Sequence, residues 1–187
     1  MMRFKWASLV FLLFSPPSVG LPEEGGLADR IIAVVEGRVI TLSDLRLENE
    51  LRAVSICEFS PMQTHREEDG MTFLIELQVL RHLAGDNPLY RPSNDEVNQR
   101  MAKMLAHWGS EEAYMNFKKI HGLDDAKLRT NLQTMMIAES YAKRKLGVGK
   151  EEMDAELLQR YDEWISDQIT SVQLMLIPEI KEQDLKR

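Results

Sequence analysis

The sequence has few of the residues from which catalytic and metal sites are usually built. It contains one cysteine and four histidines, and no two of those histidines stand at the four-residue spacing with which a helix presents zinc ligands. A Gly-x-Ser-x-Gly nucleophile elbow is absent. The string Gly147-Val148-Gly149-Lys150 resembles part of a phosphate-binding loop, but Glu151 stands where that motif needs Ser or Thr. We therefore expect no metal, no cofactor and no catalytic residues.

The single cysteine, Cys57, excludes an internal disulfide. Stability must then come from a packed core, which a chain of 187 residues can build as one domain. Free cysteines are among the residues most often buried. We expect Cys57 to be a small buried side chain near a helix end, and a bond between two chains is the alternative.

Positive charge is also scarce. The chain carries 23 Lys+Arg against 30 Asp+Glu, a formal net charge of −7, and no basic run is longer than Lys143-Arg144-Lys145. A negatively charged surface repels polyanions unless one face is locally basic. Nucleic acid and anionic membrane surfaces are therefore not expected as partners.

Long hydrophobic runs are absent except at the N-terminus. There the apolar segment 6–14 follows Arg3 and Lys5 and precedes the small residues Ser18-Val19-Gly20, which is the pattern of a secretory signal peptide in residues 1–20. The segment is far shorter than the roughly 20 residues that span a bilayer as a helix. We expect cleavage after Gly20, export to the periplasm and no stable membrane insertion.

A β-hairpin that leads directly into a helix is predicted behind this signal. The β-branched run 31–35, the turn Glu36-Gly37 and the run 38–40 have hairpin composition. The Thr41 hydroxyl can then cap a helix by accepting the backbone N–H of Asp44. The negative charge of Asp44 in the first turn is favoured by the helix dipole. Residues 21–27, with a proline and two glycines, are expected to form a flexible leader before the hairpin.

Most of the remaining chain has helical periodicity. The pattern predicts helices at 42–56, 71–84, 94–108, 110–122, 124–146 and 150–166, with a polar link at 63–70. The helix 71–84 is apolar on nearly every side and should be central. Residues 172–177 favour a strand, and since a two-stranded hairpin is marginal alone, we expect them to add a third strand to the hairpin. Exchange of this strand in a homodimer is the alternative. The fold class is thus mainly α: a bundle of five to six helices, a small N-terminal hairpin, a C-terminal strand, and a charged tail at 179–187.

Methionine is plentiful, with eleven residues in the chain. Several stand on helix faces beside aromatics, where they can be plain core filler. Because thioether side chains repack at low cost, the same residues could line an adaptable apolar groove for many polypeptide segments. The residues expected in such a groove are Met101, Met104, Leu105, Trp108, Tyr114 and Phe117.

Three segments carry a family resemblance. They are DRIIAVVEGRVITLSDL at 29–45, FLIELQVLRHLAG at 73–85 and HGLDDAKLRTNLQTMMIAESYAKRKL at 121–146. Their order and spacing resemble the N-terminal domain of the SurA-type periplasmic chaperones and parvulin-like prolyl isomerases, over about residues 28–178. The resemblance implies a helical domain that shields unfolded or extended segments of exported and outer-membrane proteins.

The end of the chain departs from that family. VQLMLIPE at 172–179 looks like the opening strand of a parvulin module, yet eight residues follow it, whereas a complete catalytic domain needs on the order of 90. We therefore expect an ATP-independent holdase without isomerase activity. A parvulin-type prolyl isomerase, or a fragment of one, is the first alternative, and a structural subunit with one dedicated partner is the second.

Overall fold

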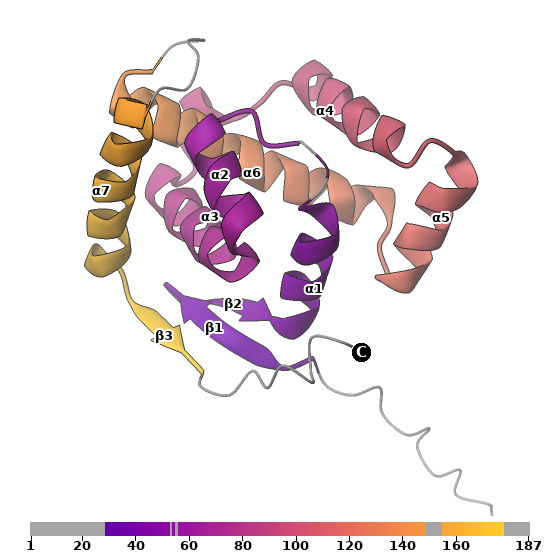
Figure 1. Ribbon diagram of the computed structural model, residues 1–187, viewed down its shortest axis with the longest axis horizontal. Helices are drawn as coiled ribbons and strands as arrows, with labels where there is room; N and C mark the ends of the chain where they lie inside the picture. The colour runs from indigo at the N-terminus through magenta and orange to yellow at the C-terminus, as the bar shows by residue number, and fades with distance from the viewer. Residues whose placement is uncertain (1–28, 53, 55, 149–154, 178–187) are drawn as a thin grey trace, which may run out of the picture.

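The computed structural model describes residues 29–52, 54, 56–148 and 155–177. The structure is mainly helical with one small sheet, which confirms the expected fold class (Figure 1). In chain order the elements are β1 (Ile31–Val35), β2 (Arg38–Thr41), α1 (Leu42–Leu51), α2 (Ser60–Glu68), α3 (Gly70–Ala84), the 3-10 turn η1 (Pro88–Tyr90), α4 (Asn94–His107), α5 (Glu111–Ile120), α6 (Asp125–Leu146), α7 (Ala155–Ser171) and β3 (Leu174–Leu176).

The hairpin turns where the sequence indicates. Glu36 and Gly37 both have positive φ, at 49° and 74°, which is the backbone that a two-residue hairpin turn requires. After β2, the Thr41 hydroxyl accepts the Asp44 N–H at 3.3 Å and the Asp44 carboxylate accepts the Thr41 N–H at 3.0 Å. This reciprocal capping box starts α1 without a linker.

The C-terminal strand β3 pairs antiparallel with β1 in the same chain and gives the strand order β2-β1-β3. Val34 faces Met175 across this pair, and backbone hydrogen bonds from Glu36 N to Gln173 O and from Ile177 N to Ile32 O, both 3.0 Å, flank it. The predicted third strand is confirmed, and a single chain is sufficient to complete the sheet.

Helix α3 lies at the centre of the molecule. It contacts α1, α2, α6, α7 and both strands of the hairpin, and its buried residues occur all around it. In Figure 1 the sheet lies below α3, α7 lies at the left edge, and α6 crosses behind α2 and α3. Helices α4 and α5 form an arm that extends away from the body at the far end of α6.

Two stretches differ from the sequence-based expectation. Residues 60–68, expected to be mostly a polar link, form helix α2; Pro61 is preorganised for a first helical turn, and Met62 and Arg66 are both fully buried. Helix α1 ends at Leu51 and not at residue 56. The two differences meet at Arg66, which lies inside the protein and donates to the Leu51 carbonyl at the end of α1.

The last helix ends later than expected, at Ser171. It is described from Ala155 to Ser171, whereas the expected range was 150–166, whose first residues lie outside the described part. The expected signal peptide at 1–20, leader at 21–27 and tail at 179–187 also lie outside the described residues. Within the described ranges, no helix combines the length and apolarity needed to cross a membrane.

Candidate functional site

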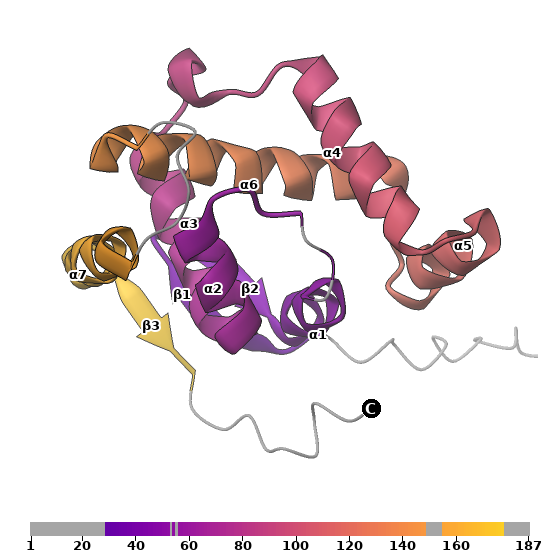
Figure 2. The same ribbon diagram turned by 45° about the horizontal axis from the view of Figure 1, so that its top comes forward.

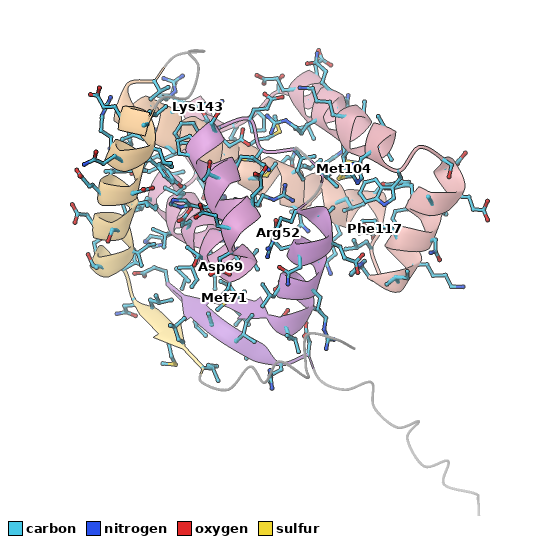
Figure 3. All side chains as sticks on the ribbon, in the orientation of Figure 1. Arg52, Asp69, Met71, Met104, Phe117 and Lys143 are labelled. Atoms are coloured by element: carbon cyan, nitrogen blue, oxygen red, sulfur yellow. The ribbon has the colours of Figure 1, made fainter. Side chains whose placement is uncertain are left out.

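The six residues expected to form an apolar groove all lie on the arm, but they differ in exposure. Met104, Tyr114 and Phe117 are buried in the main core. Met101 and Trp108 are half-buried against that core, and Leu105 is 39% exposed. Figure 3 shows Met104 and Phe117 on the side of the arm that faces the body. A ligand arriving from solvent would therefore reach Met101, Leu105 and Trp108 before it reached the buried three.

The aromatic residues of the arm pack together at the corner between α4, α5 and α6. The Trp108 ring lies 4.6 Å from Phe117 and 5.7 Å from Tyr114, between ring centroids. The Tyr114 hydroxyl donates to Asp125 Oδ1 at 2.7 Å, and burial and this carboxylate raise the pKa of Tyr114. These contacts join α4 and α5 to the start of α6.

A cleft of about 270 Å³ lies at the junction of the hairpin, α1, α3 and α6. Its floor is apolar and includes side chains from four helices, and its rim carries polar groups. The floor consists of Ile40, Leu47, Leu51, Ile56, Phe73, Leu74, Leu77, Met104, Leu128, Leu132 and Met135, and the rim of Arg38, Val39, Asp44, Glu48, Gln78, Asn131 and Thr134.

The rim is polar but has little available charge. Asp44 is engaged in the capping box of α1, and the carboxylate of Glu48 binds Arg66. Gln78 and Asn131 stand on different helices, α3 and α6, and a carboxamide can both donate to and accept from a peptide backbone. The third charged group of the rim, Arg38 of β2, is exposed. The cleft therefore offers an apolar floor with neutral hydrogen-bonding groups and one exposed arginine at its edge.

One wall of the cleft is fixed by Arg66, a fully buried residue of α2. Its Nε donates to Glu48 on α1, and its Nη atoms donate to the carbonyls of Leu51 at 2.6 Å and Val54 at 2.7 Å. Carbonyls at a helix C-terminus have no intrahelical partner. Arg66 binds one such carbonyl, that of Leu51, and the Val54 carbonyl in the segment that follows, and so holds the end of α1 against the bundle. Burial raises the pKa of Glu48 even though Arg66 opposes this.

A second buried arginine fixes the chain that continues from α1. Arg100 of α4 donates to the Ile56 carbonyl and forms an ion pair with Glu139 of α6, with Nη1 and Oε1 3.0 Å apart. Its Nη2 lies 3.0 Å from Glu58, and the Glu139 carboxylate also accepts the Glu58 N–H at 3.0 Å. Ile56 and Leu51 both line the cleft, so the two arginines set the position of the same wall.

Groups suited to covalent or metal chemistry are not gathered in the described ranges. No three His, Cys, Asp or Glu side chains there are placed to share a metal ion. Cys57 is buried, and burial together with Glu139 raises the pKa of its thiol. The thiol is therefore not activated as a nucleophile.

Comparison of the chain with protein-family models, with curated proteins and with solved structures gives no match. The functional argument therefore depends on the sequence pattern and on the geometry of the cleft.

Sequence reasoning found Met104 of the cleft and missed most of its other residues. Leu47, Phe73, Leu77 and Leu132 read as ordinary core positions, because helical periodicity shows which face is apolar but not whether a neighbour covers it fully. The sequence signal that could have indicated the cleft was a polar residue beside an apolar helix face, such as Gln78 next to Leu77 in α3.

Proposed function

We propose that this chain is an ATP-independent holdase of the cell envelope, which binds extended apolar segments of unfolded exported polypeptides, including outer-membrane proteins. The observation that carries the proposal is the cleft with its apolar floor and its polar, hydrogen-bonding rim. The export signal and the resemblance to the SurA-type N-terminal domain support the periplasm as its location.

The size of the cleft favours side chains of an extended segment as the ligand. An α-helix with its side chains is about 10–12 Å in diameter, which is too large for a space of about 270 Å³. Apolar side chains of an extended segment can enter the cleft, while Gln78 and Asn131 can satisfy the backbone between them. Specificity would then be for apolar character and extended shape, which suits many clients.

The arm adds exposed apolar surface to the proposed site. Leu105 of α4, Met115 of α5 and Ile120 at the end of α5 are 39%, 52% and 64% exposed. We propose that Leu105, with Met101 and Trp108 beside it, contacts client segments that extend beyond the cleft. Binding of this kind lowers the concentration of free unfolded chains by mass action and so slows their aggregation.

Light scattering by an unfolded outer-membrane protein tests the proposal. The chain should suppress aggregation when present in stoichiometric excess, without ATP. Asn131→Trp should reduce this protection several-fold because the indole fills the cleft. The matched control is Thr130→Trp. Thr130 directly precedes Asn131 on α6, is also exposed and does not line the cleft. Aggregation that proceeds unchanged with the wild-type chain would reject the holdase.

A proline-limited refolding assay distinguishes the holdase from a prolyl isomerase. Proline isomerisation takes tens of seconds without a catalyst. An isomerase accelerates this slow phase at substoichiometric amounts, whereas a holdase retards refolding in proportion to its concentration. We expect retardation.

A further inference from the structure

A buried ionic cluster joins the C-terminal part of the fold to the bundle. His65 of α2 places Nδ1 on Glu76 Oε1 of α3 and Nε2 on Asp162 Oδ1 of α7, the latter at 2.8 Å. The second oxygen of Glu76 accepts the Tyr161 hydroxyl of α7 at 3.1 Å. Three helices therefore meet at one imidazole, and the Glu76 and Tyr161 side chains are almost completely buried.

Both ring nitrogens of His65 face carboxylate oxygens. A neutral imidazole has one N–H and one lone pair, so it can donate to only one of the two carboxylates, and its lone pair would face the other. The imidazolium has two N–H groups and satisfies both. Between two ionised carboxylates the geometry therefore favours the protonated ring, whose single positive charge is shared by a carboxylate of α3 and one of α7.

We propose that the C-terminal unit, α7 together with β3, docks on the bundle through a protonated His65 that bridges α3 and α7. Loss of this proton leaves Glu76 and Asp162 without a shared cation and weakens the attachment of α7. Because β3 follows α7 directly, the third strand of the sheet is coupled to the same proton. The inference does not depend on the proposed holdase function.

The groups that face His65 favour its protonated form. From α3 the facing group is Glu76, and from α7 the facing groups are Asp162 and the Tyr161 hydroxyl. On α2 itself, the neighbouring Arg66 is directed to Glu48 and to the end of α1. The hydrogen bond to Glu76 is the main cause that raises the pKa of His65 from 6.5 to about 9, against the opposing effect of burial.

Trp164 of α7 reports directly on this docking. Its ring centroid lies 6.1 Å from both Tyr161 and Tyr141 of α6, so its environment changes if α7 moves. Trp108 on the arm is an internal reference. The full chain is labelled with 5-fluorotryptophan, the resonances are assigned by Trp→Phe variants, and fluorine NMR spectra are recorded from pH 6 to 10.5.

We expect the Trp164 resonance to titrate with a midpoint near pH 9 while the Trp108 resonance stays constant. His65→Gln should remove the titration. Asp162→Asn should lower the midpoint toward 6.5, the ordinary value, because one of the two carboxylates is lost; Asp162 is half exposed, so this variant should fold even if His65→Gln does not. The control His82→Gln, at a half-exposed histidine, should leave the midpoint unchanged.

Three results would overturn the proposal. The first is a Trp164 resonance that does not move between pH 7 and 10 in the folded chain. The second is a titration that persists unchanged in Asp162→Asn and in folded His65→Gln. The third is a shift that Trp108 shares equally, because this reports unfolding of the whole molecule and not release of α7.

Discussion

At the scale of single residues, the fold depends on polar side chains placed inside it. Arg66 is fully buried, Arg100 is 5% exposed, and both donate to backbone carbonyls between α1 and α2 as well as to a carboxylate. A buried charge is tolerated only when it is paired and hydrogen-bonded. These two arginines convert an irregular connection into a fixed wall of the cleft.

Arg66→Ala should lower the free energy of unfolding by about 3–5 kcal/mol, because it leaves the buried Glu48 carboxylate without its cation and removes a second donor from the Leu51 and Val54 carbonyls. Urea denaturation measures the change. The control Arg91→Ala removes an exposed arginine that pairs loosely with Asp86 and should cost less than about 1 kcal/mol. Equal losses in the two variants would contradict the role assigned to Arg66.

His65 should make the stability of the chain depend on pH above neutrality. Its pKa of about 9 in the folded protein exceeds the 6.5 of an ordinary histidine, so protonation stabilises the folded state. The contribution is complete below pH 6.5, decreases as pH rises toward 9 and is absent above it; at 1.36 kcal/mol per pKa unit it is at most about 3 kcal/mol. Urea unfolding at pH 6 and pH 9.5 should show the loss, and His65→Gln should reduce the difference. Equal pH dependence in both proteins would be inconsistent with this account.

Cys57 should be inert in the folded chain. Burial raises the pKa of its thiol well above 9.0, and the thiolate is the reactive form. We expect Ellman's reagent to modify Cys57 slowly in native buffer and rapidly in urea. Rapid labelling of the native protein would show that the region between α1 and α2 is open.

At the scale of elements, the sequence predicts what local chemistry determines. The hairpin, the capped starts of α1 and α4, the central α3 and the third strand are all determined by turn residues, caps and periodicity, and the structure confirms them. Helix α2 could not be predicted in this way. Its polar residues Arg66 and His65 face inward, and only their tertiary partners explain why.

The start of α4 tests whether a local capping interaction determines where a helix begins. The Ser93 hydroxyl accepts the Glu96 N–H at 3.3 Å, and the Glu96 carboxylate accepts the Ser93 N–H at 2.7 Å. Ser93→Ala should destabilise the protein by about 1 kcal/mol, the usual cost of a lost N-cap. Thermal unfolding measures this, with Ser171→Ala, near the end of α7, as a control without an N-cap. No change in Ser93→Ala would show that packing of the arm, and not the cap, determines where α4 begins.

At the scale of the whole molecule, the cleft is a product of how the elements are arranged. Each of α1, α3 and α6 presents an ordinary apolar face, and the cleft exists because β2 and the arm leave part of these faces open. No local pattern encodes such an opening, which is why the sequence pointed to the arm and only Met104 is shared. Tyr114 and Phe117 are instead buried within the arm and do not line the cleft.

Site-specific photocrosslinking tests the central claim, binding of extended apolar segments in the cleft, most directly. Benzoylphenylalanine replaces Val39, which is 46% exposed at the cleft, or Asp167, which is exposed on α7 away from it. After irradiation with an unfolded outer-membrane protein, the account predicts crosslinks from position 39, lost in Asn131→Trp, and few from position 167. Equal crosslinking from both positions, or none from position 39, would contradict it.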